Sequence, residues 1–317
     1  MRDQTSQPVF PPPPPGEGRG EGIRGEANQL TELLPQLTSR LSIALNLNRR
    51  EARLEAQILI ARALGVDRAW LIAHDRDALS ATHCSTIENL IARRAAGEPV
   101  AYILGEREFY GLSFAVTPAV LIPRPDTELL VETALQYLPA HTPCRILDLG
   151  TGSGAIAISL ALHRPLAEVI AMDISADALA VAQSNARRLG AGNVHFEIGD
   201  WYAAKNLKKS VKNFDIIVSN PPYIAATDPH LANGDLRFEP HRALASGEDG
   251  LNDLRQIIAG APAYLAPNGW LWLEHGFKQA AAVIELLRQQ GFEQTGTRRD
   301  LAGLDRVSGG CWQTKAG

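Results

Sequence analysis

Residues 145–160 read R-I-L-D-L-G-T-G-S-G-A-I-A-I-S-L, and this stretch decides the fold. Residues 145–149 have the short apolar pattern of a buried strand, and three glycines separate them from a helical apolar run. Glycine lets the backbone turn sharply and lets a ligand lie directly on the loop, where exposed N–H groups can meet it. The stretch therefore predicts a strand, a ligand-binding turn and a helix, the unit of an α/β fold.

Strand and helix patterns alternate along the rest of the chain. The further strand candidates are residues 168–172, 194–198, 214–219 and 269–273, and the helical patterns between and after them include 177–189, 252–265 and 279–290. Residues 292–314 are expected to add two final strands, connected by R-R-D-L-A-G-L-D-R. This order is typical of an open, mostly parallel sheet with helices on both faces and a ligand crevice at the carboxyl ends of the strands.

The chain before residue 123 divides into three segments by composition. Residues 1–26 are rich in proline and glycine, cannot bury a core and are expected to stay extended or disordered. Apolar residues then recur every three or four positions, which predicts a small helical domain over residues 27–105. Residues 106–122 carry aromatic and β-branched residues around Gly111, the pattern of a hairpin linker. The α/β domain is expected over residues 123–317.

Bulk composition points to an ordinary cytoplasmic protein. The chain has 317 residues, 45% of them hydrophobic, and a net charge of −4, which argues against a stable grip on nucleic acid. Cys84, Cys144 and Cys311 lie far apart, so neither a disulfide framework nor a zinc site is suggested. No apolar run is long enough to span a membrane, and no secretory signal begins the chain. Arg93 and Arg94 lie among glutamates, which favours a solvated, salt-bridged helix face.

Acidic and aromatic residues follow the next two strand candidates. Asp173 stands where a carboxylate can accept hydrogen bonds from both hydroxyls of a ribose. Asp200 could meet an adenine amino group, and the Trp201 indole could pack on the ring. The glycine loop also fits a G-x-G-x-x-A pattern ending at Ala155, so a dinucleotide enzyme stays open from the loop alone. Asp148 favours S-adenosylmethionine, because an ionised carboxylate would repel a pyrophosphate but tolerate an ammonium and a sulfonium.

The fourth strand candidate runs into S-N-P-P-Y-I, residues 219–224. Proline supplies no N–H to a sheet, so the strand must stop and the motif must lie at the crevice. The Asn220 side-chain carbonyl and the Pro221 backbone carbonyl would accept both hydrogens of a planar amino group and aim its nitrogen at a methyl donor. Tyr223 could stack on that group and exclude water. The motif predicts methyl transfer by orientation, without a metal or a covalent nucleophile.

These motifs resemble a known family. The run D-L-G-T-G-S-G-A-I-A, followed by Asp173 and S-N-P-P-Y-I, is similar to class I S-adenosylmethionine-dependent methyltransferases that modify exocyclic or amide nitrogens. Three further stretches resemble the HemK family, the glutamine methyltransferases of peptide-chain release factors: G-E-P-V-A-Y-I-L-G-E-R-E-F-Y-G-L, L-I-P-R-P-D-T-E and D-L-R-F-E-P-H-R-A-L-A. The resemblance covers residues 28–310.

The resemblance implies a fold and a reaction. The fold would be a Rossmann-like, mostly parallel seven-stranded sheet, with a small all-helical N-terminal domain joined by a β-hairpin. The reaction would transfer a methyl group from S-adenosylmethionine to the amide nitrogen of the glutamine in the Gly-Gly-Gln motif of class 1 release factors. S-adenosylhomocysteine would be the product. The helical domain would supply part of the release-factor surface.

The resemblance also implies site residues, position by position. The cofactor would be held by Gly150, Thr151, Gly152, Ser153, Gly154, Asp173, Trp201 and Asn220. The glutamine would be held by Asn220, Pro221, Pro222 and Tyr223, with Asn220, Pro221 and Tyr223 acting in catalysis. Arg237 and Glu239, in the long loop after the motif, would shape the substrate channel. The pair Glu274 and His275 is interpreted as packing at a strand end, and the eight histidines offer no metal-ligand spacing.

Four alternatives fit part of the same sequence. A methyltransferase acting on the amino group of a nucleic-acid base would use the same Asn-Pro-Pro-Tyr motif, although the acidic balance counts against it. A glutamine methyltransferase of a large-subunit ribosomal protein is a close relative, but L-I-P-R-P-D-T-E looks more like the release-factor enzymes. A nucleotide-dependent oxidoreductase would leave the motif without a role. A module that binds the cofactor without catalysis is disfavoured by the intact Asn220 and Tyr223.

Overall fold

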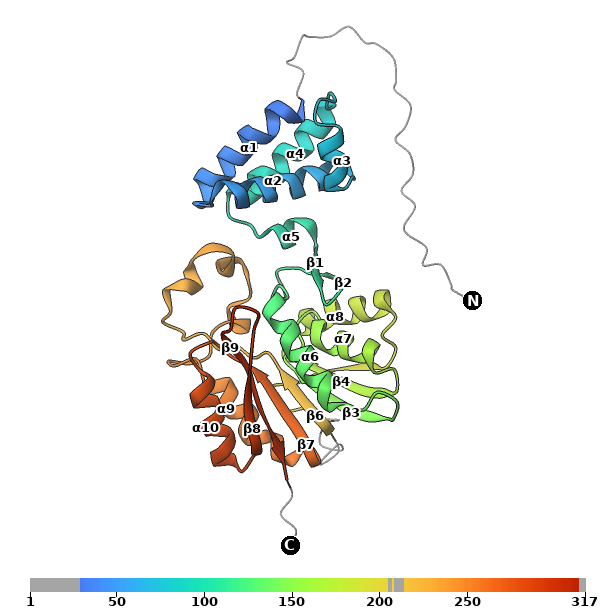
Figure 1. The fold of residues 1–317 in the computed structure, drawn as a ribbon, viewed down its shortest axis with the longest axis vertical. Helices are drawn as coiled ribbons and strands as arrows, with labels where there is room; N and C mark the ends of the chain where they lie inside the picture. Colours follow the sequence, from blue (N-terminus) through green and yellow to red (C-terminus); the bar gives the residue numbers. More distant parts are fainter. Residues whose placement is uncertain (1–28, 205–206, 208–213, 314–317) are drawn as a thin grey trace, which may run out of the picture.

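The computed structural model describes residues 29–204, 207 and 214–313, so the predicted disordered extension lies outside the described residues. Its N-terminal part is a group of helices, which Figure 1 shows apart from the large sheet: α1 (Leu30–Leu45), α2 (Arg49–Leu64), α3 (Arg68–Ala73), α4 (Ala81–Ala95) and α5 (Val100–Leu104). Their apolar faces share one core, in which Leu41, Leu59 and Ile91 are completely buried. The helical N-terminal region is confirmed.

A short hairpin follows the helices. Strands β1 (Glu106–Phe109) and β2 (Leu112–Ala115) pair antiparallel, and Tyr110 and Gly111 both have the positive φ that a two-residue hairpin turn requires. The completely buried rings of Phe109 and Phe114 pack edge to face and join the core of the α/β part. The hairpin is therefore anchored to the main sheet and leads the chain to it.

The main sheet has seven strands in the order β5-β4-β3-β6-β7-β9-β8. Their bounds are β3 (Cys144–Leu149), β4 (Ala167–Asp173), β5 (Val194–Ile198), β6 (Phe214–Ser219), β7 (Leu265–Glu274), β8 (Glu293–Arg299) and β9 (Asp305–Trp312). Strands β3 to β7 run parallel, whereas β9 pairs antiparallel with both β7 and β8. This is the mostly parallel seven-stranded sheet that the sequence predicted.

Helices cover both faces of this sheet. They are α6 (Glu128–Tyr137), α7 (Ala155–His163), α8 (Ala176–Leu189), α9 (Asn252–Gly260) and α10 (Ala280–Gln290). Neighbouring residues of β3 contribute to different cores: Ile146 packs with α6 and α7, while Leu147 packs with α9 and α10. Short 3-10 turns complete the chain at η1 (Pro125–Thr127), η3 (Pro229–Ala232), η4 (Gly234–Phe238), η5 (His241–Ala243) and η6 (Ala261–Ala263).

One predicted helix is too long and one strand too short. The helix expected over residues 252–265 ends at Gly260, and β7 begins already at Leu265. Pro262 lacks the N–H that a continuing helix would use, and Leu265 pairs instead with Phe214 at the start of β6. Within the described residues, no helix is long and apolar enough to cross a bilayer.

The prediction of a solvated face is wrong for one arginine of the N-terminal helices. Arg93 is partly exposed and pairs with Glu98, as expected. Arg94 is 4% exposed, because its guanidinium pairs with Glu55 of α2 and with Asp235 of the long loop after β6. A periodic charge pattern on a helix does not reveal such a partner, which lies far away in the sequence.

Candidate active site

The candidate site lies where the order of strands reverses. The chain leaves β3 toward β4 and β5 on one side and returns to β6 on the other, so β3 and β6 are neighbours at the switch point. Leu149 and Ser219, the last residues of these strands, are register partners. Gly150 and Asn220 therefore follow paired residues, which brings the glycine loop and the Asn-Pro-Pro-Tyr motif to one crevice.

The glycine loop needs its glycines for two different reasons. Gly150, Gly152 and Gly154 all have positive φ, at 73°, 55° and 83°. A Cβ on Gly154 would also lie 2.7 Å from Cδ1 of Ile158 and 3.2 Å from Cβ of Ala182. Gly154 thus permits close packing of α7 against α8, whereas Gly150 and Gly152 line the cavity described below.

Asp173 ties the glycine loop to the end of β4. One carboxylate oxygen accepts a hydrogen bond from the N–H of Gly152 at 2.9 Å, and the other accepts from the N–H of Ser175 at 2.9 Å. Burial raises the pKa of Asp173, and these backbone hydrogen bonds lower it. Asp173 lies at the cavity, and its binding of ribose hydroxyls stays a prediction.

Asp148 does not face the cavity, so the ligand argument built on its charge is wrong. The side chain is completely buried beneath the loop, where Oδ2 accepts a hydrogen bond from the Thr151 hydroxyl at 2.7 Å. Burial raises the pKa of this carboxyl to about 7. The sequence placed Asp148 correctly near the strand end, but alternation along β3 points its side chain away from the ligand side.

Trp201 has the geometry of a cavity wall. Its backbone is left-handed, with φ of 47°, and its indole N–H donates to Oδ1 of Asp253 at 3.2 Å. A Cβ on Gly150 would lie 3.3 Å from the indole ring, so the ring and the glycine loop face each other closely. Asp253 was missed in the sequence, because it lies in a helix whose other residues show only an ordinary amphipathic pattern.

A cavity of about 610 Å³ runs along this edge of the sheet. The predicted residues at its surface are Gly150, Gly152, Asp173, Asp200, Trp201, Asn220 and Pro222. Thr151, Ser153, Gly154, Pro221 and Tyr223 are not among the lining residues. The side chains of Thr151 and Ser153 are buried, and the Ser153 carbonyl accepts from Nδ2 of the buried Asn185, which also bonds to Ala115 of the hairpin.

The Asn-Pro-Pro-Tyr motif is held from behind by residues of two other segments. Nδ2 of Asn220 donates to Oγ1 of Thr127 at 3.1 Å, and the Tyr223 hydroxyl donates to Oε1 of Glu274 at 3.2 Å. The Tyr223 carbonyl accepts from Nε2 of Gln279 at 3.0 Å. Thr127 and Gln279 were not predicted as site residues, and Glu274 was predicted only to pack at a strand end. Thr127 belongs to the stretch P-D-T-E, residues 125–128, but that stretch alone indicates only the start of a helix.

The chain is similar to known proteins in both of its parts. Two family models match, the PrmC N-terminal domain over residues 32–105 and a methyltransferase domain over residues 140–302. The release factor glutamine methyltransferase of Bordetella pertussis is 57% identical over 258 residues, which cover 81% of this chain and 94% of that protein. The chain belongs to the release factor glutamine methyltransferase family.

Other relatives and one solved structure extend the comparison. The release factor glutamine methyltransferase of Yersinia pestis is 50% identical, covering 81% of this chain and 91% of that protein. The catalytic domain of hMettl16, solved in complex with a 3′UTR hairpin, superposes with a TM-score of 0.52 at 17% identity, covering 72% of this chain and 84% of that one. The latter similarity concerns the fold alone.

The residues of this methyltransferase fit S-adenosylmethionine. The cavity offers a glycine surface without side chains, a carboxylate at Asp173 and an indole face at Trp201. These groups match a ligand that lies directly against the loop backbone and carries ribose hydroxyls and a flat aromatic base. Asp200 lies beside them at the cavity surface.

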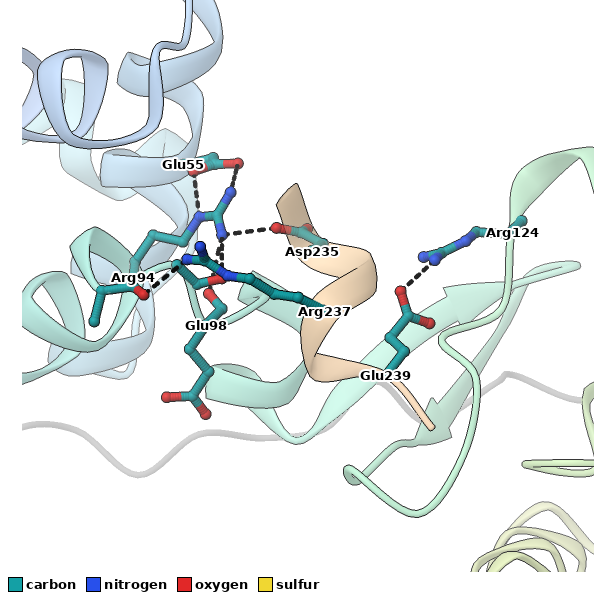
Figure 2. Close-up of polar contacts among 9 residues, drawn as sticks. Glu55, Arg94, Glu98, Arg124, Asp235, Arg237 and Glu239 are labelled. Atoms are coloured by element: carbon teal, nitrogen blue, oxygen red, sulfur yellow. Dashed lines mark hydrogen bonds and ion pairs between the residues drawn. The ribbon is translucent and has the colours of Figure 1, made fainter. Parts of the chain in front are cut away.

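In this methyltransferase, the long loop after β6 forms one wall of the cavity. Figure 2 shows that the same loop also contacts the N-terminal helices. Arg94 of α4 donates to Oδ1 of Asp235 at 2.9 Å, and Arg237 donates to the carbonyl of Ala96 at 3.0 Å. Residues 240–243 of the same loop line the cavity. We call residues 235–243 the strap.

The other end of the strap is fixed to the segment before η1. The side chain of Glu239 is buried, accepts from the N–H of Ile122 at 3.0 Å and forms an ion pair with Arg124 (Figure 2). Arg237 and Glu239 are thus both bound within the chain. Neither side chain lines the cavity, and their role in a substrate channel stays a prediction.

Proposed function

We propose that this methyltransferase transfers a methyl group from S-adenosylmethionine to the side-chain amide nitrogen (N5) of the glutamine in the Gly-Gly-Gln motif of class 1 release factors. One observation carries the proposal for the site: Asn220 lies at the cavity with its NH2 group hydrogen-bonded to Thr127. The oxygen of its amide is then the end left for a ligand. A planar substrate NH2 group is the matching partner.

The chemistry must overcome the low nucleophilicity of an amide nitrogen, whose lone pair is delocalised. S-adenosylmethionine supplies an electrophilic methyl group on a sulfonium. The Asn220 oxygen and the Pro221 carbonyl accept the two amide hydrogens, which orients the nitrogen and stabilises the positive charge that develops on it. Pro221 and Pro222 restrict the backbone of the motif, so these acceptors are held in place before the substrate arrives.

In this proposal Tyr223, which is half-buried and does not itself line the cavity, supports the substrate amide from beside Pro222, which does. Its hydroxyl is already bonded to Glu274, and burial raises its pKa far above the usual value, so it stays neutral. A neutral aromatic ring can cover the substrate amide and keep water from it without adding charge. The bond from nitrogen to the methyl carbon would form as the bond from sulfur to that carbon breaks, which leaves S-adenosylhomocysteine. The methylated nitrogen would then lose one of its two protons to solvent, and no protein group is alkylated on the way.

The release factor would contact both parts of the chain. We assign residues 27–105 to docking of the release factor, residues 106–122 to the linker and residues 123–317 to catalysis. We place the reaction in the cytoplasm. The contacts of Arg94 and Arg237 with the strap support this division, because they connect the docking helices to the cavity wall. Neither stable binding to nucleic acid nor a bound metal is part of the proposal.

Incubation with labelled S-adenosylmethionine tests the substrate directly. The acceptors are a class 1 release factor, its variant with alanine at the glutamine of the Gly-Gly-Gln motif, the large-subunit ribosomal protein and DNA. Label on the intact release factor and none on the variant is the expected result. Label on the variant, or on DNA or the ribosomal protein in place of the release factor, would contradict the proposal.

A further inference from the structure

Asn220 can present either of two opposite ends of its amide to a substrate. Its oxygen accepts hydrogen bonds, whereas its NH2 group only donates them. A substrate NH2 group also only donates, so a reversed Asn220 would oppose donor to donor at the reacting nitrogen. The orientation of this amide therefore decides whether the site can hold an amide nitrogen at all.

Thr127 is the described partner of the Asn220 NH2 group. It is 4% exposed, it ends η1, and its N–H donates to the Arg124 carbonyl at 3.1 Å, so its backbone is fixed. The distance from Nδ2 of Asn220 to Oγ1 of Thr127 is 3.1 Å. By itself, a threonine hydroxyl could also donate its proton to the oxygen of a reversed Asn220, because a hydroxyl both donates and accepts.

Glu274 removes that ambiguity. It follows Leu273, the register partner of Ser219, so Glu274 and Asn220 lie side by side at the ends of β7 and β6. The carboxyl is 1% exposed, and its Oε1 accepts from the Tyr223 hydroxyl at 3.2 Å. Its Oε2 is buried without a hydrogen-bond partner, which leaves an acceptor for the Thr127 proton, and the Thr127 hydroxyl lowers the pKa of this carboxyl. When the Thr127 proton is committed to this carboxylate, the hydroxyl can only accept from Asn220.

The ionisation of Glu274 suits this role. Burial raises its pKa to about 7, while the hydrogen bonds from Thr127 and Tyr223 lower it, Asp126 raises it and Arg306 lowers it. The charged form, which accepts from both hydroxyls, is thus populated at and above neutral pH.

We propose that Thr127 is a positioning residue that holds the Asn220 oxygen toward the substrate, and that Glu274 fixes the direction of the Thr127 hydroxyl. The role of the oxygen rests on the proposed function, but the hydrogen bond itself does not. One buried carboxylate would then set both side chains of the motif, Asn220 through Thr127 and Tyr223 directly.

The first test needs no protein substrate. Side-chain amide hydrogen exchange of Asn220 is measured by NMR in the full chain for the wild type, Thr127→Val and Thr127→Ser. The valine is similar in shape but cannot accept a hydrogen bond. Exchange should accelerate about tenfold or more in Thr127→Val and stay near the wild-type rate in Thr127→Ser, a scale of about 1.4 kcal/mol. Equal exchange rates in all three proteins would overturn the assignment.

The second test measures turnover with the release factor. Thr127→Val should lower kcat by roughly 10- to 100-fold, as expected for a misoriented acceptor, with little change in the KM for S-adenosylmethionine. Thr127→Ser should restore most of the activity. Thr133→Val is the matched control, because Thr133 is a second buried threonine, 1% exposed, that lies in α6 and outside the motif contacts described above.

A double variant separates positioning from general damage. In the Asn220→Ala background there is no amide to orient, so Thr127→Val should have no further effect on kcat. An additional loss equal to that in the wild-type background would contradict the proposal and indicate a purely structural role. If the wild type fails to methylate the release factor, the proposed function fails, and the exchange measurement still decides the role of Thr127.

Discussion

Nη1 of Arg94 and Oδ1 of Asp235 lie 2.9 Å apart, although 141 positions separate the two residues. The same guanidinium pairs with Glu55 and donates to the carbonyls of Gly97 and Glu98. Burial lowers the pKa of Arg94, but its acidic partners raise it by more, so it is held as a cation. One buried cation thus joins α2, α4, the following turn and the strap.

Replacing Arg94 should destabilise the protein far more than replacing its neighbour. Arg94→Met leaves several acceptors without their donor, and we expect the free energy of unfolding to fall by about 3 kcal/mol. Arg93→Met is the matched control, because the Arg93–Glu98 pair is partly exposed and should contribute no more than about 1 kcal/mol. Urea denaturation measures both values. Similar losses in the two variants would contradict the central role of Arg94.

Asn220→Ala should separate turnover from cofactor binding. The substitution removes the acceptor for the substrate amide, so we expect kcat to fall by about 100-fold or more. The affinity for S-adenosylmethionine should change much less, because the predicted main cofactor contacts are the glycine loop and Asp173. Turnover and equilibrium binding are measured on the same protein, with the exposed Asn233→Ala as control. Parallel losses of both quantities would disprove this division of labour.

Asp148 should make stability depend on pH. Its usual pKa is 3.8, and burial raises it to about 7 in the folded protein, so the folded state holds this proton more tightly. The stabilisation is complete below the unfolded pKa and is lost as the pH rises through about 7. The stability of the wild type relative to Asp148→Asn should therefore fall between about pH 4 and pH 7, by up to about 1.4 kcal/mol per pH unit.

A second aspartate gives the control for this experiment. Hydrogen bonds from Arg255 and from the N–H of Leu251 lower the pKa of Asp249 to about 2. Asp249 is therefore ionised in both the folded and the unfolded protein between about pH 5 and pH 7. The difference in free energy of unfolding between the wild type and Asp249→Asn should not change with pH in that range. A flat difference for Asp148→Asn as well would mean that its carboxyl is not held protonated in the folded protein.

Two glycine substitutions should distinguish backbone strain from crowding. Gly154 and Gly190 both have positive φ, at 83° and 77°, so alanine costs about 1 kcal/mol at either position. Only at Gly154 would the new Cβ meet Ile158 and Ala182, whereas nothing lies within 4 Å at Gly190. The free energy of unfolding, measured by denaturation, should therefore fall by about 1–3 kcal/mol more in Gly154→Ala than in Gly190→Ala. Equal losses would show that α7 and α8 can move apart freely.

Much of this architecture could be predicted because local pattern determines it. Strand ends, glycine turns and the proline stop after β6 depend on neighbouring residues, and they place Gly150, Asp173 and Asn220 at one edge of the sheet. The side-chain directions could not be predicted in the same way. Asp148 lies under the loop because of the register of β3, and Thr127 reaches Asn220 only because η1 packs over the end of β6.

The strap gives the molecule a property that neither of its parts has alone. Its residues contact α4 on one side and line the cavity on the other. A protein that docks on the helices and shifts the strap would change the affinity of the cavity for its small ligand wherever that ligand contacts the two strap positions differently. Thermodynamic linkage then requires the small ligand to change the affinity for the protein by the same factor. Ordered or cooperative binding of two substrates can thus arise from a single stretch of nine residues, 235–243.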